Sequence, residues 1–483
     1  MVRRRRGVMV AALMVLGCGS ESSPTSMNPP GVQTLVLGAV MDQASASAYY
    51  SWPSSAKLAV DQINEGLTTA GAPVRISLVL TDTAQDASVA TMKSLEVVRM
   101  RNAKALMVDT SRNAIAITKM MYDADPANDL NVPITCVTCT APNLNDPMAM
   151  GTDDVDTATL RDAAGWSFRT CNRATEQTAV LQRVILSRGT KGDANGDGKF
   201  KVAILVLDDN SGHGFVTSTR KQFAATNPDV IVEKIVLPGP AIDINNSIFW
   251  DGIAAKLVDD NSDCVQDPNT ATACLPPATG DGEPDVIMEN LNPGYNIAIS
   301  KALTRAQNHI TFFHAHAFRA PQTAEILRSA IDGQQGVCAV LYDSSPSGMK
   351  FASDMHTALG RDPALLDSSV YDATVTLSLA MVKASRGLPD PSMVTGAQVR
   401  DALSQLNDKA GEVVGVGAAE FARAFQKFAA GAPINYEGAS GPVDFDAYGN
   451  VWVKLALYAG MDGTFVDVQK FDCISDHSCP AVP

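Results

Sequence analysis

The sequence predicts an α/β protein of two lobes, each built on a doubly wound parallel sheet. Strand-like and helix-like segments alternate along the chain with short connections, a rhythm typical of parallel sheets that carry helices on both faces. The strand-like segments are nearly continuous apolar runs, as strands buried on both faces require. With 483 residues the chain is too long for one hydrophobic core, so two sheets are expected.

The alternation runs from residue 34 to residue 313. Strands are expected over residues 34–41, 74–80, 103–108, 132–137, 201–207, 230–236, 285–288 and 310–313. Helices are expected between them over residues 56–67, 88–100, 114–122, 177–186, 214–224 and 297–306. In the first helix, apolar residues recur at the three- and four-residue spacing of one helical face. Two polar segments, 191–199 and 259–284, interrupt the rhythm.

The start of the chain has the features of an export signal. Four arginines, Arg3 to Arg6, precede an apolar run over residues 7–16 that is too short to span a bilayer, which predicts a signal peptide over residues 1–17. The run ends in Val-Leu-Gly-Cys18, which resembles the bacterial lipobox and predicts lipidation of Cys18. The alternative is an ordinary signal peptide with an incidental cysteine. Residues 18–32 are then a Ser-, Pro- and Gly-rich tether.

These features predict a lipid-anchored protein in the periplasm or at the cell surface. By resemblance to enteric sorting rules, Gly19 after the cysteine favours the outer membrane. The formal net charge of the chain is −14, and without the four arginines of the signal peptide it is −18, from 34 basic and 52 acidic residues. Such a surface repels nucleic acid and anionic lipid. We therefore expect no nucleic-acid partner, and membrane contact through the lipid anchor alone.

Eight cysteines remain after Cys18, and an even number in an exported chain predicts disulfides. Cys264 and Cys274 bracket part of the polar segment 259–284 and are expected to pair. Cys473 and Cys479, close together near the C-terminus, are expected to pair as well.

The remaining cysteines include a Cys-x-x-Cys motif at Cys136 and Cys139. That spacing occurs in redox dithiols and in half of a zinc site. Here it follows an apolar strand-like run and precedes a loop, which favours a structural pairing, with Cys171 as a candidate partner for one of the two. Cys338 is expected to stay free.

Several local motifs occur along the chain in a fixed order. They are Leu37-Gly-Ala-Val40 with Asp61-Gln-Ile-Asn64, the strand and loop 133–142, Trp166-Ser-Phe-Arg-Thr170, the strand and turn 202–214, Tyr371-Asp-Ala373, and the segment Gly438 to Gly449. Together they resemble the type I periplasmic binding proteins, and within them the leucine/isoleucine/valine-binding group of ABC-transporter substrate-binding proteins. The resemblance spans roughly residues 33–465.

The resemblance implies the type I periplasmic binding protein fold, with two lobes joined by three crossovers. These are expected near Gly165, Ala317 and Gly438. Lobe one would then comprise residues 33–165 and 318–438, and lobe two residues 166–317 and 439–483. The fold also implies that a ligand binds between the lobes, beyond the carboxyl ends of the strands, and that closure of the hinge buries it.

The same resemblance places candidate ligand-binding residues on loops of both lobes. In lobe one they are Thr110, Ser111, Asn113, Thr138 and Thr140, whose polar groups suit a carboxylate. Apart from the resemblance, the aromatic Tyr49 and Tyr50 near the first strand are candidates to stack on a ligand. In lobe two they are Ser211, His213, Tyr295 and His316. For each of these residues, loop or core packing is the structural alternative. Ser211 stands where relatives have a tyrosine, and the loop 314–318 lacks their acidic residue, which argues against a simple aliphatic amino acid.

One loop has the spacing of a calcium site. Asp193, Asn195 and Asp197 occupy positions 1, 3 and 5, and Gly198 occupies position 6 of such a loop. Position 12 is Ile204, so the bidentate glutamate is missing. The alternatives are a structural Ca²⁺ site and a solvated Gly/Asp turn. No other cofactor is expected.

No Gly-x-Ser-x-Gly, Walker A or His-Glu-x-x-His motif occurs in the sequence, so we expect no catalysis. The expected function is that of a monomeric substrate-binding lipoprotein. It would capture a small polar solute, an amino acid or a related metabolite, and deliver it to an ABC permease. The alternative is a sensory or scaffold lipoprotein of the same fold that binds a partner protein.

Overall fold

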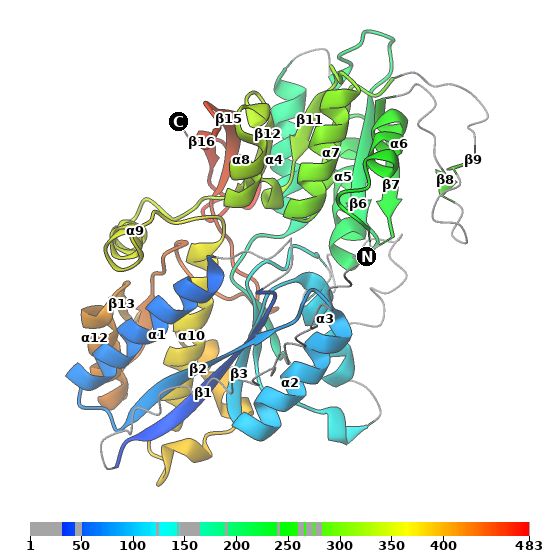
Figure 1. Cartoon of the computed structure of the whole chain (residues 1–483). Helices are drawn as coiled ribbons and strands as arrows, with labels where there is room; N and C mark the ends of the chain where they lie inside the picture. The colour runs from blue at the N-terminus through cyan, green and yellow to red at the C-terminus, as the bar shows by residue number, and fades with distance from the viewer. Residues whose placement is uncertain are drawn as a thin grey trace, which may run out of the picture.

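The computed structural model describes residues 31–43, 51–121, 125–142, 144, 165–188, 192–238, 242–258, 265–266, 274–275 and 283–482. These residues form two α/β lobes, one above the other in Figure 1. The predicted signal peptide, the lipidation site Cys18, the candidates Tyr49 and Tyr50, and the pairing of Cys264 with Cys274 all lie outside the described residues.

Lobe one, the lower lobe in Figure 1, is built on a five-stranded parallel sheet in the order β2-β1-β3-β4-β5. Its strands are β1 (Gln33–Met41), β2 (Val74–Asp82), β3 (Ala103–Val108), β4 (Ile134–Cys136) and β5 (Ser167–Arg169). One face is covered by α1 (Trp52–Thr69) and α10 (Asp367–Ser385), and α12 (Ala418–Ala429) packs against these two helices. The other is covered by α2 (Ala87–Arg101) and α3 (Ser111–Met121). The lobe also contains α9 (Pro346–Leu359), α11 (Gly396–Leu403), and the short strands β13 (Glu412–Val414) and β14 (Ile434–Tyr436).

Lobe two has a seven-stranded sheet in the order β16-β15-β12-β11-β10-β6-β7. Its parallel strands are β6 (Lys201–Leu207), β7 (Ile231–Leu237), β10 (Val286–Asn290), β11 (Thr311–His314) and β12 (Gln335–Ala339). At the other end of the sheet from β7, β15 (Leu455–Met461) and β16 (Thr464–Phe471) are antiparallel additions. Helices α4 (Ala174–Ser187) and α5 (Asn210–Thr226) pack together, as do α6 (Ser247–Val258), α7 (Pro293–Arg305) and α8 (Pro321–Leu327). The short strands β8 (Val265–Gln266) and β9 (Cys274–Leu275) pair separately.

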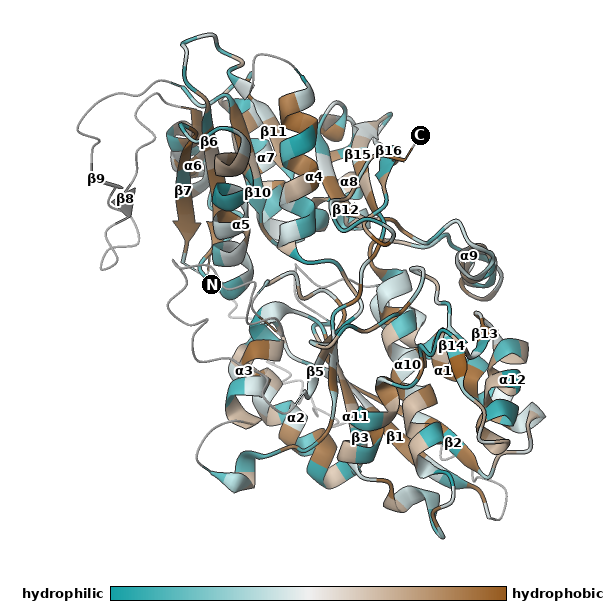
Figure 2. Cartoon of the chain, turned by 180° about the vertical axis from the view of Figure 1, so that it is seen from behind, coloured by the Kyte–Doolittle hydropathy of each residue, from teal (hydrophilic) through white to brown (hydrophobic). Residues whose placement is uncertain are grey.

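The apolar patterns explain this architecture. In β1, Leu35, Leu37 and Ala39 belong to the core cluster that includes α1, whereas Val40 belongs to the cluster that includes α2 and α3. Successive side chains of a strand point to opposite faces of the sheet, so both faces are covered and the strand is apolar from Leu35 onward. Figure 2 shows the hydrophobic colour concentrated in the strands of both sheets. The predicted α/β class with parallel sheets is therefore confirmed.

The crossovers lie further along the chain than the sequence predicted. β5 pairs with β4, so the chain leaves lobe one after Arg169, a few residues beyond Gly165. β12 pairs with β11, so residues 318–339 belong to lobe two and the return lies beyond Ala317. The third crossing also begins after Gly438. Strands of three to five residues form because they pair with neighbouring strands. That pairing leaves no clear pattern in the local sequence, so the sequence does not indicate where such strands lie.

Two strong links hold the segment after Gly438 to lobe one. Asp372 of α10 accepts hydrogen bonds from the backbone N–H groups of Ala439 and Ser440, both at 2.8 Å. The backbone N–H of Arg169 donates to the carbonyl oxygen of Gly449 at 2.9 Å. Lobe one therefore includes this segment, which the sequence prediction assigned to lobe two.

The structure confirms one of the predicted disulfides and corrects the expected partner of another cysteine. Cys473 pairs with Cys479, as predicted. Cys136 and Cys139 pair with each other, so Cys171 is not the partner of either, and both Cys171 and Cys338 are buried free thiols. In the described part of the chain, no helix has the length and apolar composition needed to cross a membrane.

Candidate functional site

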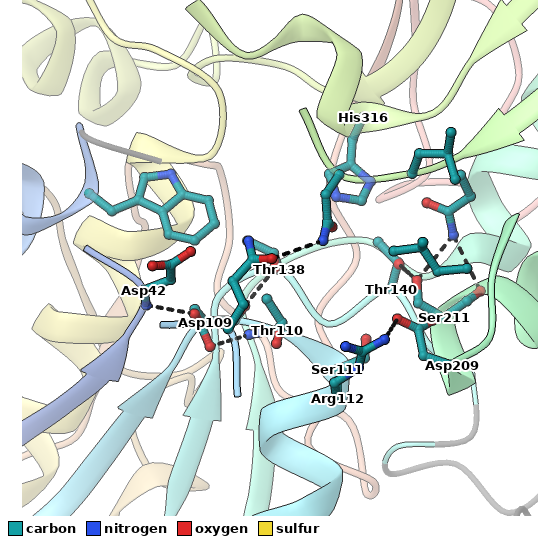
Figure 3. Close-up of a pocket in the computed structure, with 16 residues that line it drawn as sticks. Asp42, Asp109, Thr110, Ser111, Arg112, Thr138, Thr140, Asp209, Ser211 and His316 are labelled. Carbon is teal, nitrogen blue, oxygen red and sulfur yellow. Dashed lines mark hydrogen bonds and ion pairs between the residues drawn. The ribbon is translucent and has the colours of Figure 1, made fainter. Parts of the chain in front are cut away.

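A cavity with about 720 Å³ of empty space, part of it open to solvent, lies between the two lobes (Figure 3). Residues from both lobes line it: Asp42, Trp52, Gln85, Asp109, Thr110, Ser111, Arg112, Thr138, Thr140, Leu207, Asp209, Ser211, Asn290, Leu291, Asn292 and His316. Most of them follow the carboxyl end of a strand. That edge of a parallel sheet is where loops and helix N-termini converge on a ligand.

Asp109 is a deeply buried acid of lobe one, and it follows the end of β3. Its Oδ2 accepts a hydrogen bond from the backbone N–H of Asp42 at 2.8 Å. Its Oδ1 accepts from the backbone N–H of Thr110 and from Nδ2 of Asn113, both at 2.8 Å. Burial raises the pKa of Asp109 to about 6, and these donors act against that rise. The side chain is therefore mostly ionised at pH 7.

The loop after β4, residues 138–141, is fixed at three points. The Oγ1 of Thr138 donates to the carbonyl oxygen of Asp109 at 2.5 Å. The Cys136–Cys139 disulfide closes the base of the loop. The Nη1 of buried Arg169 donates to the carbonyl oxygens of Cys139 at 2.6 Å and Ala141 at 2.9 Å. Thr138 and Thr140 are thus presented to the cavity by a rigid loop.

Direct contacts join the lobes around the cavity. The hydroxyls of Thr140 and Ser211 are hydrogen-bonded at 2.7 Å. The Nη2 of Arg112, in lobe one, lies 3.5 Å from Oδ2 of Asp209, in lobe two. Asp209 also caps α5 through a hydrogen bond from the backbone N–H of Gly212 at 2.9 Å. The two lobes are therefore in a closed arrangement, as Figure 3 shows for these labelled pairs.

His316 contributes a neutral polar group from lobe two. It is buried, and its Nδ1 lies 3.3 Å from Nε2 of Gln177. Burial lowers the pKa of His316 to about 4, so the imidazole carries no charge at pH 7. His314, two residues earlier, is fully buried in the core of lobe two, where its ring stacks on Phe318 and its Nδ1 meets Oε1 of Glu289 at 3.1 Å.

The structure brings together most of the predicted site residues that it describes. Thr110, Ser111, Thr138, Thr140, Ser211 and His316 all line the cavity. Three predicted residues do not. Asn113 lies behind the cavity and holds Asp109, His213 bonds through Nε2 to Oδ1 of Asp208 at the surface, and Tyr295 is buried against Trp250 in the core of lobe two.

Sequence reasoning missed the acidic residues of the site. Asp42, Asp109 and Asp209 line the cavity, and each comes within two residues of the end of an apolar strand. That position is itself a signal, because the ends of parallel strands meet at one edge of the sheet. Gln85 was missed for a different reason, since it lies in a loop with no local pattern.

The loop with calcium-like spacing lies on lobe two, away from the cavity. Both carboxylate oxygens of Asp193 accept backbone N–H groups, from Gly196 at 2.7 Å and Gly198 at 3.0 Å. The Oδ1 of Asn195 accepts from the backbone N–H of Asp197 at 3.0 Å. No group of three or more His, Cys, Asp or Glu side chains suited to a metal occurs among the described residues. Calcium binding at this loop stays a prediction.

Calcium addition tests that prediction directly. If Asp193 and Asp197 hold Ca²⁺, millimolar Ca²⁺ is expected to raise the Tm of the parent protein by a few degrees, because a ligand that binds only the folded state stabilises it. The double variant Asp193→Ala/Asp197→Ala should lose this rise. A parent whose Tm does not respond to Ca²⁺ in a thermal melt has a solvated turn here instead.

Comparison with known proteins identifies the fold. No protein-family model matches the sequence, and no curated protein sequence matches it significantly. Among solved structures, a leucine-binding protein from Thermotoga maritima is similar over 91% of this chain and 99% of its own, with 15% identity and a TM-score of 0.61. A solute-binding protein of an ABC transporter from R. palustris, in complex with benzoate, is similar over 93% and 97%, with 15% identity and a TM-score of 0.62.

A third similar structure is the branched-chain amino acid transporter substrate-binding protein from Streptococcus pneumoniae in complex with isoleucine. The similarity covers 93% of this chain and 99% of that one, with 11% identity and a TM-score of 0.58. These proteins share the two-lobed α/β architecture described above. The chain has the type I periplasmic binding protein fold, as its ordered motifs predicted.

Proposed function

We propose that this protein is an extracytoplasmic substrate-binding lipoprotein that captures a small polar solute between its lobes for an ABC importer. The observation that carries the proposal is the cavity at the carboxyl ends of both sheets, which is lined by hydroxyl and charged side chains from both lobes. Polar groups that converge on a cavity of this kind are typical of small-molecule sites. The structures with the same fold belong to proteins whose names describe solute binding.

The anchor and location belong to the same proposal. The arginine-rich start, the short apolar run and Cys18 support export and lipidation. A lipid-anchored protein in the periplasm or at the cell surface would hold its captured solute close to a permease. We propose that it acts as a monomer, without a catalytic step.

A thermal-shift screen against amino acids, small acids and amines tests this function. A solute at 100 times its Kd is expected to stabilise the protein by about 2.7 kcal/mol. Ser211→Ala removes a cavity hydroxyl that bonds to Thr140 and Asn290, so the solute that binds is expected to lose about fivefold in affinity. His213→Ala, on the same helix but outside the cavity, is the matched control and should bind like the parent.

A sensory or scaffold lipoprotein is the second candidate. The direct contacts of Thr140 with Ser211 and of Arg112 with Asp209 favour it, since they join the lobes through the protein's own side chains. A protein partner recovered with the anchored protein, together with no stabilising solute in the screen, would support this function and contradict transport.

A further inference from the structure

The charges around the cavity are unevenly distributed. Among the residues that the structure describes, three carboxylates line it, from Asp42, Asp109 and Asp209, against one guanidinium, from Arg112. Arg112 faces Asp209 across the lobes at 3.5 Å. Figure 3 shows this pair on one side of the view and Asp42 with Asp109 on the other. The described lining therefore has the Arg112–Asp209 pair at one end and two carboxylates, those of Asp42 and Asp109, at the other, which we call the acidic end.

Asp109 is a buried carboxylate held in place by hydrogen bonds. It is 1% exposed and receives three N–H donors. Among the residues that the structure describes, no lysine, arginine or histidine forms an ion pair with it. A buried charge is costly unless an opposite charge or hydrogen bonds compensate it. The three hydrogen bonds supply part of that compensation, and a positive charge in the cavity next to Asp109 would add to it.

Asp42 adds a second negative charge at the same end. Its backbone N–H bonds to Asp109 at 2.8 Å, and it raises the pKa of Asp109 through charge repulsion, after the larger effect of burial. Two neighbouring carboxylates in a largely buried site repel each other. A ligand cation between them would relieve that repulsion, whereas an anion would increase it.

Trp52 and the hydroxyls suit an organic cation. The indole of Trp52 lines the cavity, and its Nε1 donates to the carbonyl oxygen of Leu365 at 3.0 Å, which fixes the ring. Indole rings attract ammonium groups and bury carbon chains well. Thr110 and Ser111 add hydroxyl oxygens that can accept ammonium N–H groups.

We propose that the captured solute is a cationic organic amine, whose ammonium group binds at Asp42 and Asp109 and whose carbon skeleton lies beside Trp52. This inference rests on the proposed function, because it names the solute class of the same cavity. It separates this protein from one that takes an aromatic acid, since a carboxylate at the acidic end would meet two like charges.

Titration calorimetry of the purified protein with four probes tests the proposal. Putrescine and L-lysine carry a net positive charge, L-leucine is a neutral zwitterion, and benzoate is an anion. A cationic probe is expected to bind at least about tenfold more tightly than leucine, as an added charge-assisted hydrogen bond allows. If leucine or benzoate binds as tightly as the amines or more so, the solute class is wrong while solute capture stands.

Two variants locate the cation. Asp42→Asn and Asp109→Asn keep the shape of the side chain and remove its charge, so each is expected to weaken the binding of the amine by about tenfold or more. Asp61→Asn, on the exposed face of α1, is the matched control and should bind like the parent. Circular dichroism confirms that each variant is folded, and Asp42→Asn is informative if Asp109→Asn fails to fold.

The remaining outcomes decide against the proposal. Amine binding that is unchanged in both aspartate variants would place the cation elsewhere. Displacement of the amine by Ca²⁺ or Mg²⁺ at equal concentration would assign the acidic end to a metal ion. If neither the four probes nor any solute of the wider screen binds, the proposed transport function fails, and the solute class fails with it.

Discussion

Replacing Arg169 with alanine is expected to lower the free energy of unfolding by about 3–5 kcal/mol. Arg169 is fully buried at the end of β5, and its Nη1 donates to the carbonyl oxygens of Cys139 and Ala141. Alanine would leave these two carbonyls without that donor inside the protein, and it would leave a cavity where the long side chain packs. Both effects act in the folded state alone, so both reduce stability.

The same substitution is expected to abolish solute capture. The carbonyls that Arg169 holds belong to the loop that presents Thr138 and Thr140 to the cavity, so a loosened loop loses its geometry even where the protein stays folded. Urea denaturation and titration calorimetry measure the two effects. Arg183→Ala is a matched control, because Arg183 also donates to two carbonyl oxygens, those of Ser478 and Cys479, but near the surface. An equal loss of stability in both variants would contradict the role of burial.

The fold could be predicted from the sequence because its central strands are long and apolar on both faces. The predicted strands 103–108 and 201–207 match β3 and β6 residue for residue, and all seven residues of β6 are buried. The predicted apolar face of the first helix, from Ala56 to Leu67, is buried as well. In these elements the local pattern and the tertiary packing agree, so periodicity alone is sufficient.

The short elements could not be predicted in this way. β5 has three residues and β12 has five, and each is placed by pairing with a strand far away in the sequence. The lobe boundaries depend on these strands, which is why the crossovers were expected too early. The position of the Tyr295 side chain could not be predicted for the same reason. Only the fold brings Trp250 next to the Tyr295 ring, which is thereby buried in the core.

The residues of the candidate site, like the elements of the fold, could be predicted from the sequence only in part. Thr138 and Thr140 were found through the order of the motifs, and the structure places both at the cavity. The three aspartates were not predicted, although each lies just after an apolar strand. Their position at the ends of parallel strands is the signal that indicates them. The contact of Arg112 with Asp209 is between lobes and has no local signal.

Gly214→Ala is expected to weaken solute binding by about 5- to 150-fold while leaving each lobe folded. Gly214 lies in α5 of lobe two, and a Cβ built on it would lie 2.3 Å from Cδ of Pro142, in the lobe-one loop after β4. A proline ring cannot turn away, so the lobes would have to separate. Overpacking of this kind costs about 1–3 kcal/mol, which acts on the closed arrangement alone and converts to the stated loss of affinity.

Titration calorimetry with the solute from the screen measures this loss, and small-angle scattering measures the separation of the lobes as a larger radius of gyration. Gly252→Ala is the matched control, since Gly252 lies in α6 with nothing within 4 Å of its built Cβ. Both substitutions replace glycine by alanine within a helix, which favours the helix by about 0.5–1 kcal/mol, so a loss of binding in Gly214→Ala alone cannot come from unfolding. Parent-like affinity in Gly214→Ala would mean that the approach of α5 to Pro142 is not part of capture. A loss of affinity with an enlarged radius would tie solute binding to the closed arrangement of the two lobes.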